Sequence, residues 1–215
     1  MHKDIIINGD KERLELLRHE RSLVIIKPDG VIRHLVGEII SRFESKGLKI
    51  VAMKMIHPTK ELVENHYMAD EDWYMSTGTR TLAGYETQGI DAGMTAREIG
   101  LNTRRKLMEY LGAGPVVVMV LEGAHVIESV RKMRGATSPL GAEVGSIGFD
   151  YTLESYNLAD AGGWAIRNII HGSDAPEAAQ REIKLWFKDD EIVEYSTALE
   201  HIIYGTEWHQ KPRES

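Results

Sequence analysis

The chain has 215 residues, of which 42% are hydrophobic and 27% are charged, with no cysteine and a net charge of −7 at neutral pH. These values are ordinary for a globular protein of one domain, and the lack of cysteine excludes disulfides and thiolate metal sites. The acidic balance argues against broad nucleic-acid binding. No apolar run reaches the ~18–20 residues of a membrane span, and the N-terminus does not resemble a signal peptide. We therefore expect a cytoplasmic protein with no membrane partner and no specific nucleic-acid partner.

The first third of the chain predicts two strands and two helices. Residues 22–27 form a short β-branched run that the turn sequence PDG ends, as is typical of a buried strand. Apolar residues then recur at helical spacing over 35–47. Residues 48–56 alternate apolar and polar side chains like a half-buried strand, and Thr59 begins a short helix.

Residues 70–112 differ in character from the segments on either side. The stretch up to residue 95 is rich in glycine, threonine and acids and has poor periodicity, whereas 96–112 has a helical pattern. We expect this segment to be an insertion or lid outside the central sheet.

The rest of the chain predicts two more strands, each followed by a helix. Residues 115–121 are apolar on both faces, which indicates a central strand, and 124–135 form a helix. Residues 137–163 have little pattern and predict mostly loop. A last strand over 167–170 precedes a helix over 174–187, which we expect Asp174 and Glu177 to cap.

The order of these elements predicts the fold class. Without the insertion the order is βαββαβ, the ferredoxin-like α+β arrangement, in which helices cover one side of an antiparallel sheet. We expect one domain over residues 22–205, preceded by an extension over 1–21 and followed by a tail over 206–215.

His171 lies where an apolar run ends and a helix begins. A solitary histidine is most often a packing or surface residue, but small Gly172 leaves this ring accessible. The free N–H groups of the following helix suit a phosphate. Glu182, on that helix, could bond one ring nitrogen and leave the other as a nucleophile.

The common nucleotide and metal motifs are missing. There is no G-x-x-x-x-G-K-[ST] loop, no G-x-G-x-x-G after a strand and no H-E-x-x-H pair, so the sequence predicts no metal ligands. A phosphate enzyme would instead use scattered cations. Lys27, Arg131 and Arg134 are candidates, although each alone is ordinarily a solvated surface charge.

Several segments together resemble the nucleoside diphosphate kinase family. They are SLVIIKPDGVIRHLVGEIISRFESKGLKIVAMKM, GPVVVMVLEG, VRKMRGATSP and IRNIIHGSDAPEAAQREIKLWF. They occur in the family's order and span most of residues 22–204. NIIHGSD is highly specific, and it occurs together with IKPDGV.

The resemblance implies a ping-pong transfer of the γ-phosphate of a nucleoside triphosphate such as ATP to a nucleoside diphosphate, through a phosphohistidine on His171. It implies Mg²⁺ bound with the nucleotide and a homo-oligomer, either a hexamer, a tetramer or a dimer. By position in the motifs, it also implies that Lys27 contacts the transferred phosphate, Arg131 and Thr137 hold the β-phosphate region, Asn168 binds the ribose side, Tyr67 and Ser173 lie at the active centre, and Glu182 orients the histidine.

The chain departs from the family pattern at two places. The family's loop sequence PGTIRGDF reads VGSIGFDY here, so Gly148 stands where a phosphate-binding arginine is expected, and Arg134 is our first candidate to compensate. The insertion replaces a shorter connection, so the residue that stacks on the base must come from it. Trp73 offers a larger face than Tyr74, although Trp73 could equally pack the insertion onto the body.

Two other functions compete with catalysis. Gly148 favours a non-catalytic member of the family that binds nucleotide or regulates. An unrelated ferredoxin-like RNA-binding domain would show aromatic residues on its sheet and a basic surface, but VVVMV is aliphatic and the chain is acidic. Acid-labile, alkali-stable label from γ-labelled ATP would separate catalysis from binding alone.

Overall fold

The computed structural model describes residues 11–205. Residues 1–10 and the predicted tail over 206–215 lie outside the described residues. The centre of the molecule is an antiparallel sheet of four strands in the order β2-β3-β1-β4. The strands are β1 (Arg21–Ile26), β2 (Lys49–Ile56), β3 (Val116–Glu122) and β4 (Ile170–Gly172). This is the ferredoxin-like α+β arrangement that the sequence predicts.

The two central strands are the most apolar ones. All of β3 is buried, and β1 is buried from its second residue onward. Their β-branched side chains suit strands that are covered on both faces. The register sets Ile25 opposite Val118 on one side and opposite His171 on the other. The candidate nucleophile therefore lies on β4 itself, one residue beyond the predicted end of that strand.

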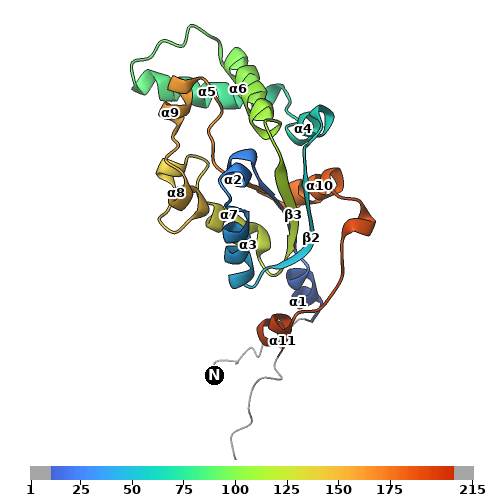
Figure 1. The fold of residues 1–215 in the computed structure, drawn as a ribbon. Coiled ribbons are helices and arrows are strands. Elements are labelled where there is room, and N and C mark those ends of the chain that lie inside the picture. The colour runs from blue at the N-terminus through green and yellow to red at the C-terminus, as the bar shows by residue number, and fades with distance from the viewer. Residues whose placement is uncertain (1–10, 206–215) are drawn as a thin grey trace, which may run out of the picture.

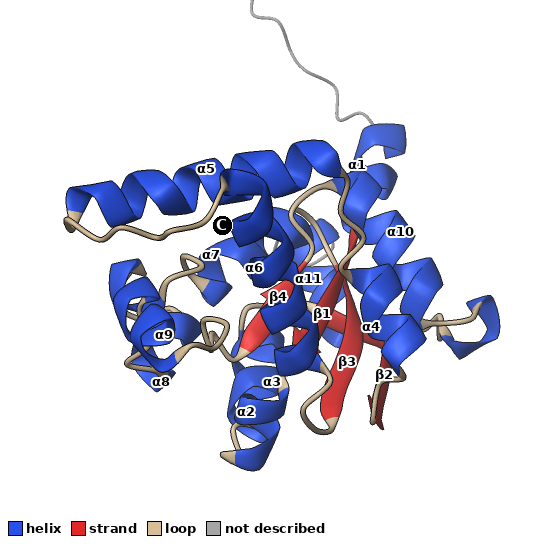
Figure 2. Ribbon diagram, turned by 90° about the horizontal axis from the view of Figure 1, so that it is seen from above, coloured by secondary structure: helices blue, strands red, loops and turns tan. Residues whose placement is uncertain are grey.

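Helices cover both faces of the sheet, so the expectation of one covered side is wrong (Figure 2). On one face, α3 (Val36–Ser45) and α7 (Val126–Arg134) bury a cluster that includes Phe43 and Val130. On the other face, α4 (Lys60–His66) and α10 (Pro176–Trp186) bury a cluster that includes Val63 and Trp186. The alternate residues of each central strand are apolar in both directions, so each face needs its own cover.

The predicted insertion forms a helical hairpin. Its arms are α5 (Glu71–Thr87) and α6 (Ala96–Leu111) (Figure 1). Residues 70–95 have poor apolar periodicity although most of them are helical, because α5 packs along α6 with glycine rather than with large apolar residues. A Cβ on Gly78 would lie 1.7 Å from the carbonyl oxygen of Ala96. At the far end of the hairpin, Tyr85 lies close to Asp160 of α9 (Tyr156–Gly162), whose charge adds to burial in raising the pKa of Tyr85.

The structure differs from three further expectations about local structure. Residues 137–163 contain two short helices that were not predicted, since the side chains of Ser146 and Ser155 cap α8 (Ile147–Tyr151) and α9. The PDG turn is the start of a short helix, α2 (Pro28–Ile32). The predicted cap of α10 is absent, since the N-cap residue is Ala175 and Pro176 begins the helix without a side-chain cap.

The remaining helices lie at the ends of the described chain. They are α1 (Lys11–Arg18), within the predicted N-terminal extension, and α11 (Ala198–Tyr204), and Figure 1 shows them side by side at the end away from α5. None of the helices within residues 11–205 is long and apolar enough to cross a membrane.

Candidate functional site

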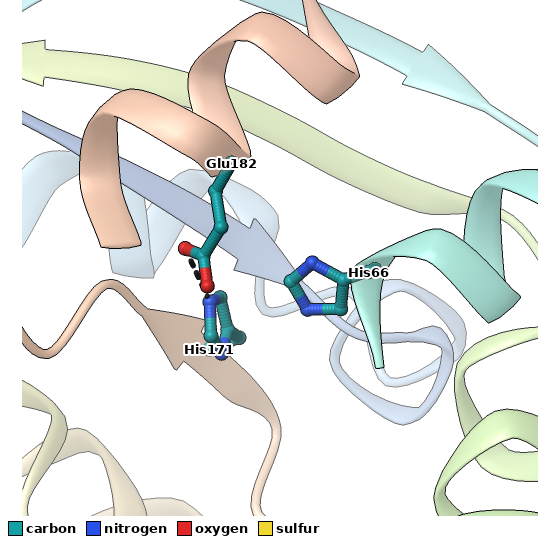
Figure 3. Close-up of side chains that lie close together, drawn as sticks. All are labelled: His66, His171 and Glu182. Atoms are coloured by element: carbon teal, nitrogen blue, oxygen red, sulfur yellow. Dashed lines mark hydrogen bonds and ion pairs between the residues drawn. The ribbon is translucent and has the colours of Figure 1, made fainter. Parts of the chain in front are cut away.

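His171 is hydrogen-bonded to Glu182, which reaches it from α10. The ring Nε2 lies 3.0 Å from Glu182 Oε2 (Figure 3). The same carboxylate oxygen accepts a bond of 2.7 Å from the Ser173 hydroxyl, which in turn accepts one from the Leu23 N–H. Ser173 and Glu182 are buried, whereas the His171 side chain keeps 21% of its surface exposed. A rigid acceptor therefore holds a ring that solvent can reach.

The Glu182 carboxylate stays ionised in this setting. Burial pushes its pKa upward, but the hydrogen bonds from His171 and Ser173 outweigh burial and lower the pKa to about 2. A charged acceptor on Nε2 fixes the neutral ring with its proton on that nitrogen. Nδ1 then carries the lone pair, and within residues 11–205 no hydrogen bond occupies it.

His66 is a second imidazole beside His171, and it was not among the predicted site residues. Its ring centre lies 4.7 Å from that of His171, at an interplanar angle of 84° (Figure 3). Burial, followed by the nearby His171, lowers the pKa of His66 to about 3, so the ring is neutral. Trp186 donates its indole N–H to His66 Nδ1 over 3.3 Å, which leaves the His66 proton on Nε2.

The His66, His171 and Glu182 side chains are close enough together to suggest a metal site. One ligand atom from each lies within 4.8 Å of the others. However, a metal needs an unprotonated imidazole nitrogen, and the His66 lone pair is already bound to Trp186. The cluster is therefore a hydrogen-bonded unit rather than a ready set of ligands.

Lys27 follows β1 and brings a cation to the same end of the sheet. Only 5% of the residue is exposed, and its Nζ donates a hydrogen bond of 2.6 Å to Asn168 Oδ1. Asn168 Nδ2 donates in turn to the Thr137 carbonyl oxygen over 3.2 Å. Burial lowers the pKa of Lys27 to about 8, although the nearby Asp29 opposes the shift. The predicted residues Lys27, Asn168 and Thr137 thus form one chain of contacts.

Two arginines of α7 lie around this chain. Exposed Arg131 donates to the Asp174 carbonyl oxygen over 3.3 Å, at the turn after β4. Arg134 is half-buried, and burial followed by the charge of Arg131 lowers its pKa. Arg134 also lowers the pKa of Lys27, which shows that the two charges are close together. The positive charges therefore gather near one another.

Gly148 lies in α8, next to the backbone of Arg134. It is buried, and a Cβ added there would lie 3.1 Å from the Arg134 carbonyl oxygen. Its φ is not positive. A larger residue at this position is therefore opposed by close packing rather than by backbone conformation.

The last two predicted residues differ in their relation to the cluster. Tyr67 ends α4 beside His66, and burial followed by the Glu182 charge raises its pKa. Arg104 of α6 donates to the Tyr67 carbonyl oxygen over 2.7 Å. Trp73 is half-buried on α5 and packs edge-on against Tyr74. Within the described chain, no hydrogen bond, ion pair or ring contact joins Trp73 to the cluster.

Besides His66, Trp186 is a member of this cluster that the sequence did not predict. Trp186 lies within the helix predicted over 174–187, where nothing in the sequence pointed to a contact with His66. Two signals of a place near the site were available: His66 directly precedes Tyr67, and Trp186 lies four residues after Glu182 on the same helix.

Comparison with known proteins identifies the family. The sequence model described as "Nucleoside diphosphate kinase" matches residues 20–77 and 100–192. The chain belongs to the nucleoside diphosphate kinase family. The unmatched residues between these two ranges, 78–99, lie within the α5–α6 hairpin.

Individual family members agree over most of their length. The nucleoside diphosphate kinase of Pyrobaculum aerophilum is 45% identical over 81% of this chain and 98% of its own, and that of Pyrococcus abyssi is 48% identical over 83% and 91%. A crystal structure of the Pyrobaculum aerophilum enzyme aligns with a TM-score of 0.79 at 44% identity, over 82% of this chain and all of the other.

A second solved structure carries ligands. The nucleoside diphosphate kinase of Borrelia burgdorferi, a transition-state mimic with bound vanadate and ADP, aligns with a TM-score of 0.73 at 34% identity, over 87% of this chain and 98% of the other. Membership of this family makes the chain an enzyme of nucleotide phosphotransfer, and the cluster around His171 is its candidate active site.

Proposed function

We propose that the enzyme transfers the γ-phosphate of a nucleoside triphosphate to a nucleoside diphosphate by a ping-pong mechanism through a phosphohistidine on His171. One observation carries this proposal: a buried carboxylate binds Nε2 of an accessible histidine and leaves Nδ1 with its lone pair. A fixed tautomer and an exposed lone pair are what a histidine nucleophile requires.

In the first half-reaction, the Nδ1 lone pair attacks the γ-phosphorus and forms a P–N bond. The bond from phosphorus to the β-phosphate oxygen breaks, and the nucleoside diphosphate leaves with that electron pair. The ring gains positive charge, which the Glu182 carboxylate stabilises while the Nε2 proton stays in place. In the second half-reaction, a β-phosphate oxygen of another diphosphate attacks the phosphorus, and the P–N bond breaks.

The neighbouring side chains suit the charge of the nucleotide. Phosphoryl transfer depends on in-line positioning and on neutralised oxygens more than on covalent help from the protein. Lys27 would contact the transferred phosphate, Arg131 and Thr137 the β-phosphate, and Asn168 the ribose side. Mg²⁺ would enter with the nucleotide as part of the substrate and neutralise its oxygens. Tyr67 and Ser173 would hold the active centre together.

The test is to incubate the protein with γ-labelled ATP and assay acid-labile, alkali-stable label. We expect label on the native enzyme and none on His171→Ala. Glu182→Gln should slow labelling at least about tenfold while nucleotide affinity stays nearly unchanged, because no phosphate ligand is altered. A native protein that takes no label would favour the alternative, a non-catalytic nucleotide-binding or regulatory member, which Gly148 also favours.

Arg134 is our candidate for the role of the arginine that Gly148 replaces. The proximity of its charge to Lys27 and Arg131 supports this assignment. Arg134→Ala should then lower kcat/KM, and Gly148→Arg should restore part of the loss relative to Gly148→Ala, which reports the packing cost alone. If Gly148→Arg restores none of the kcat/KM lost in Arg134→Ala, then Arg134 does not compensate for the missing arginine.

The remaining proposals concern substrates, assembly and location. Trp73 is our candidate for stacking on the base, since its half-buried ring has an aromatic neighbour.

We also propose a homo-oligomer. The edge strand β2 supports this, because Met53 and Met55 on it are 53% and 60% exposed. Sedimentation would test the assembly. A cytoplasmic location rests on the lack of cysteine.

A further inference from the structure

The backbone just before His171 has an unusual conformation. Ile169 is fully buried and has a φ of 64°, in the left-handed region. That region is unfavourable for a β-branched side chain, and a residue stays in it only where its surroundings hold it there. Because Ile169 lies two residues before His171, whatever holds Ile169 also sets the direction in which His171 points.

Two hydrogen bonds hold the Ile169 backbone. Its carbonyl oxygen accepts from the Lys27 N–H over 2.7 Å, and its N–H donates to the Tyr110 hydroxyl over 3.3 Å. Gly30 provides the space, since a Cβ there would lie 2.9 Å from Ile169 Cγ2. Of the two bonds, only the one from Tyr110 comes from a side chain, so only that bond can be removed by a single substitution.

Tyr110 also contacts the residues around Lys27. Its hydroxyl donates to Asp29 Oδ1 over 2.5 Å, so one oxygen both accepts from Ile169 and donates to Asp29. The Lys27 ammonium lies 5.1 Å from the centre of the Tyr110 ring, within the range of a cation–π contact. Burial, followed by the Asp29 charge, raises the pKa of Tyr110, and the hydroxyl therefore keeps its proton.

We propose that Tyr110 is a positioning residue, whose hydroxyl fixes the Ile169 backbone and thereby the direction of His171, while its ring supports the Lys27 ammonium. This rests on the proposed function of His171 and Lys27. Tyr110 comes from the last turn of α6, so the hairpin over 71–111 contributes to the nucleophile's geometry. A purely packing role does not account for a hydroxyl with two directed bonds.

The test is Tyr110→Phe in the full chain, which removes the hydroxyl and keeps the ring. Single-turnover labelling of His171 from γ-labelled ATP should slow about ten- to a hundredfold, because small displacements of a reacting group have large effects on rate. Nucleotide affinity should change less than about twofold, since the ring stays beneath Lys27. Tyr85→Phe is the matched control, because it removes another hydroxyl of the same hairpin, one that lies close to Asp160 of α9, and should label at the native rate.

A second pair of variants guards against misfolding of Tyr110→Phe. Asp29→Asn and Asp29→Ala both remove the charge beside Lys27, but only asparagine keeps an acceptor for the Tyr110 hydroxyl. Alanine should label several-fold more slowly than asparagine. Equal rates for this pair, a native rate for Tyr110→Phe, or a loss of affinity without a loss of rate would each overturn the proposal. If the native enzyme itself takes no label, the proposed function fails instead.

Discussion

Lys27 is a cation in a place where water hardly reaches it. Its ammonium keeps one strong partner, Asn168, and its pKa is lowered from 10.5 to about 8. If the charged form binds phosphate, activity falls as the pH rises through about 8, because the free enzyme then loses the proton. We expect a descending limb near pH 8 in kcat/KM, measured with a saturating second substrate.

The descending limb in the pH profile of kcat should lie at higher pH than the one in the profile of kcat/KM. Bound phosphates favour the charged lysine and raise its pKa in the complex. Lys27→Arg should lose activity but show no limb up to pH 10, because arginine stays protonated. A native kcat/KM that stays flat through pH 10 would show that Lys27 does not act through its charge.

The sequence predicted contacts between residues that are close together along the chain, and it missed contacts between distant ones. The spacing of His171 and Glu182 on a strand and the following helix predicted a bond between them, and the structure has that bond. His66 and Tyr110 come from α4 and α6, far along the chain, and only the packing of these helices brings them to the site. No spacing relative to His171 indicates such contacts.

The hairpin of α5 and α6 shows how small residues can replace an apolar stripe. Gly78 lies against the Ala96 backbone, and Gly100 lies against that of Tyr74. Helix α5 therefore carries glycine where most surface helices carry leucine, and this is why its periodicity predicted no helix. The capping by Asp70, which accepts from the Trp73 N–H, is the one local sign of the helix in the sequence.

Two glycines of α5 provide a matched pair of variants. Gly78→Ala should destabilise the protein, because its Cβ would meet backbone at 1.7 Å and the helices must separate. Gly84→Ala should stabilise it by about 0.5–1 kcal/mol, because alanine favours the helix and the space around Gly84 is open. Urea unfolding measures both. Equal changes would mean that the helices do not pack through Gly78.

Ion pairs hold together the end of the molecule that lies away from α5. Buried Glu122 of β3 accepts from Arg21 of β1 and pairs with Lys49 of β2, both at 2.8 Å. Lys49 Nζ also lies 3.0 Å from Glu200 of α11. The last described helix is thereby joined to three strands through one buried carboxylate, which no sequence pattern indicated.

Glu122→Gln should lower the free energy of unfolding at neutral pH by about 3 kcal/mol, because it removes the buried charge that Lys49 and the partly exposed Arg21 share. Burial raises the pKa of Glu122, but the bonds from Lys49 and Arg21 outweigh it and lower the pKa overall. Its contribution is therefore present above the ordinary pKa of 4.5 and lost as the pH falls below it. The difference between variant and native protein should shrink in acid.

Glu128→Gln is the control for this prediction. Its partner Lys132 lies one turn away on α7, and both side chains are mostly exposed. An exposed pair contributes little to stability, so denaturation should be unchanged. Labelling of His171 should be native in Glu122→Gln, because Glu122 contacts none of the residues of the proposed site. A Glu122 variant as stable as the native protein would show that solvent replaces the lost bonds.

The hydrogen bond from Trp186 to His66 affects how strongly trace zinc inhibits the enzyme. An indole nitrogen can only donate, so it holds the His66 lone pair on Nδ1 and keeps the proton on Nε2, where zinc would need a lone pair. In Trp186→Phe the His66 proton can move to Nδ1, and two imidazoles and a carboxylate then become a chelate around the nucleophile. Micromolar zinc should stop labelling of this variant, a chelator should restore it, and the native enzyme should resist the same dose. Equal resistance in both proteins would show that the indole gives no protection against zinc poisoning.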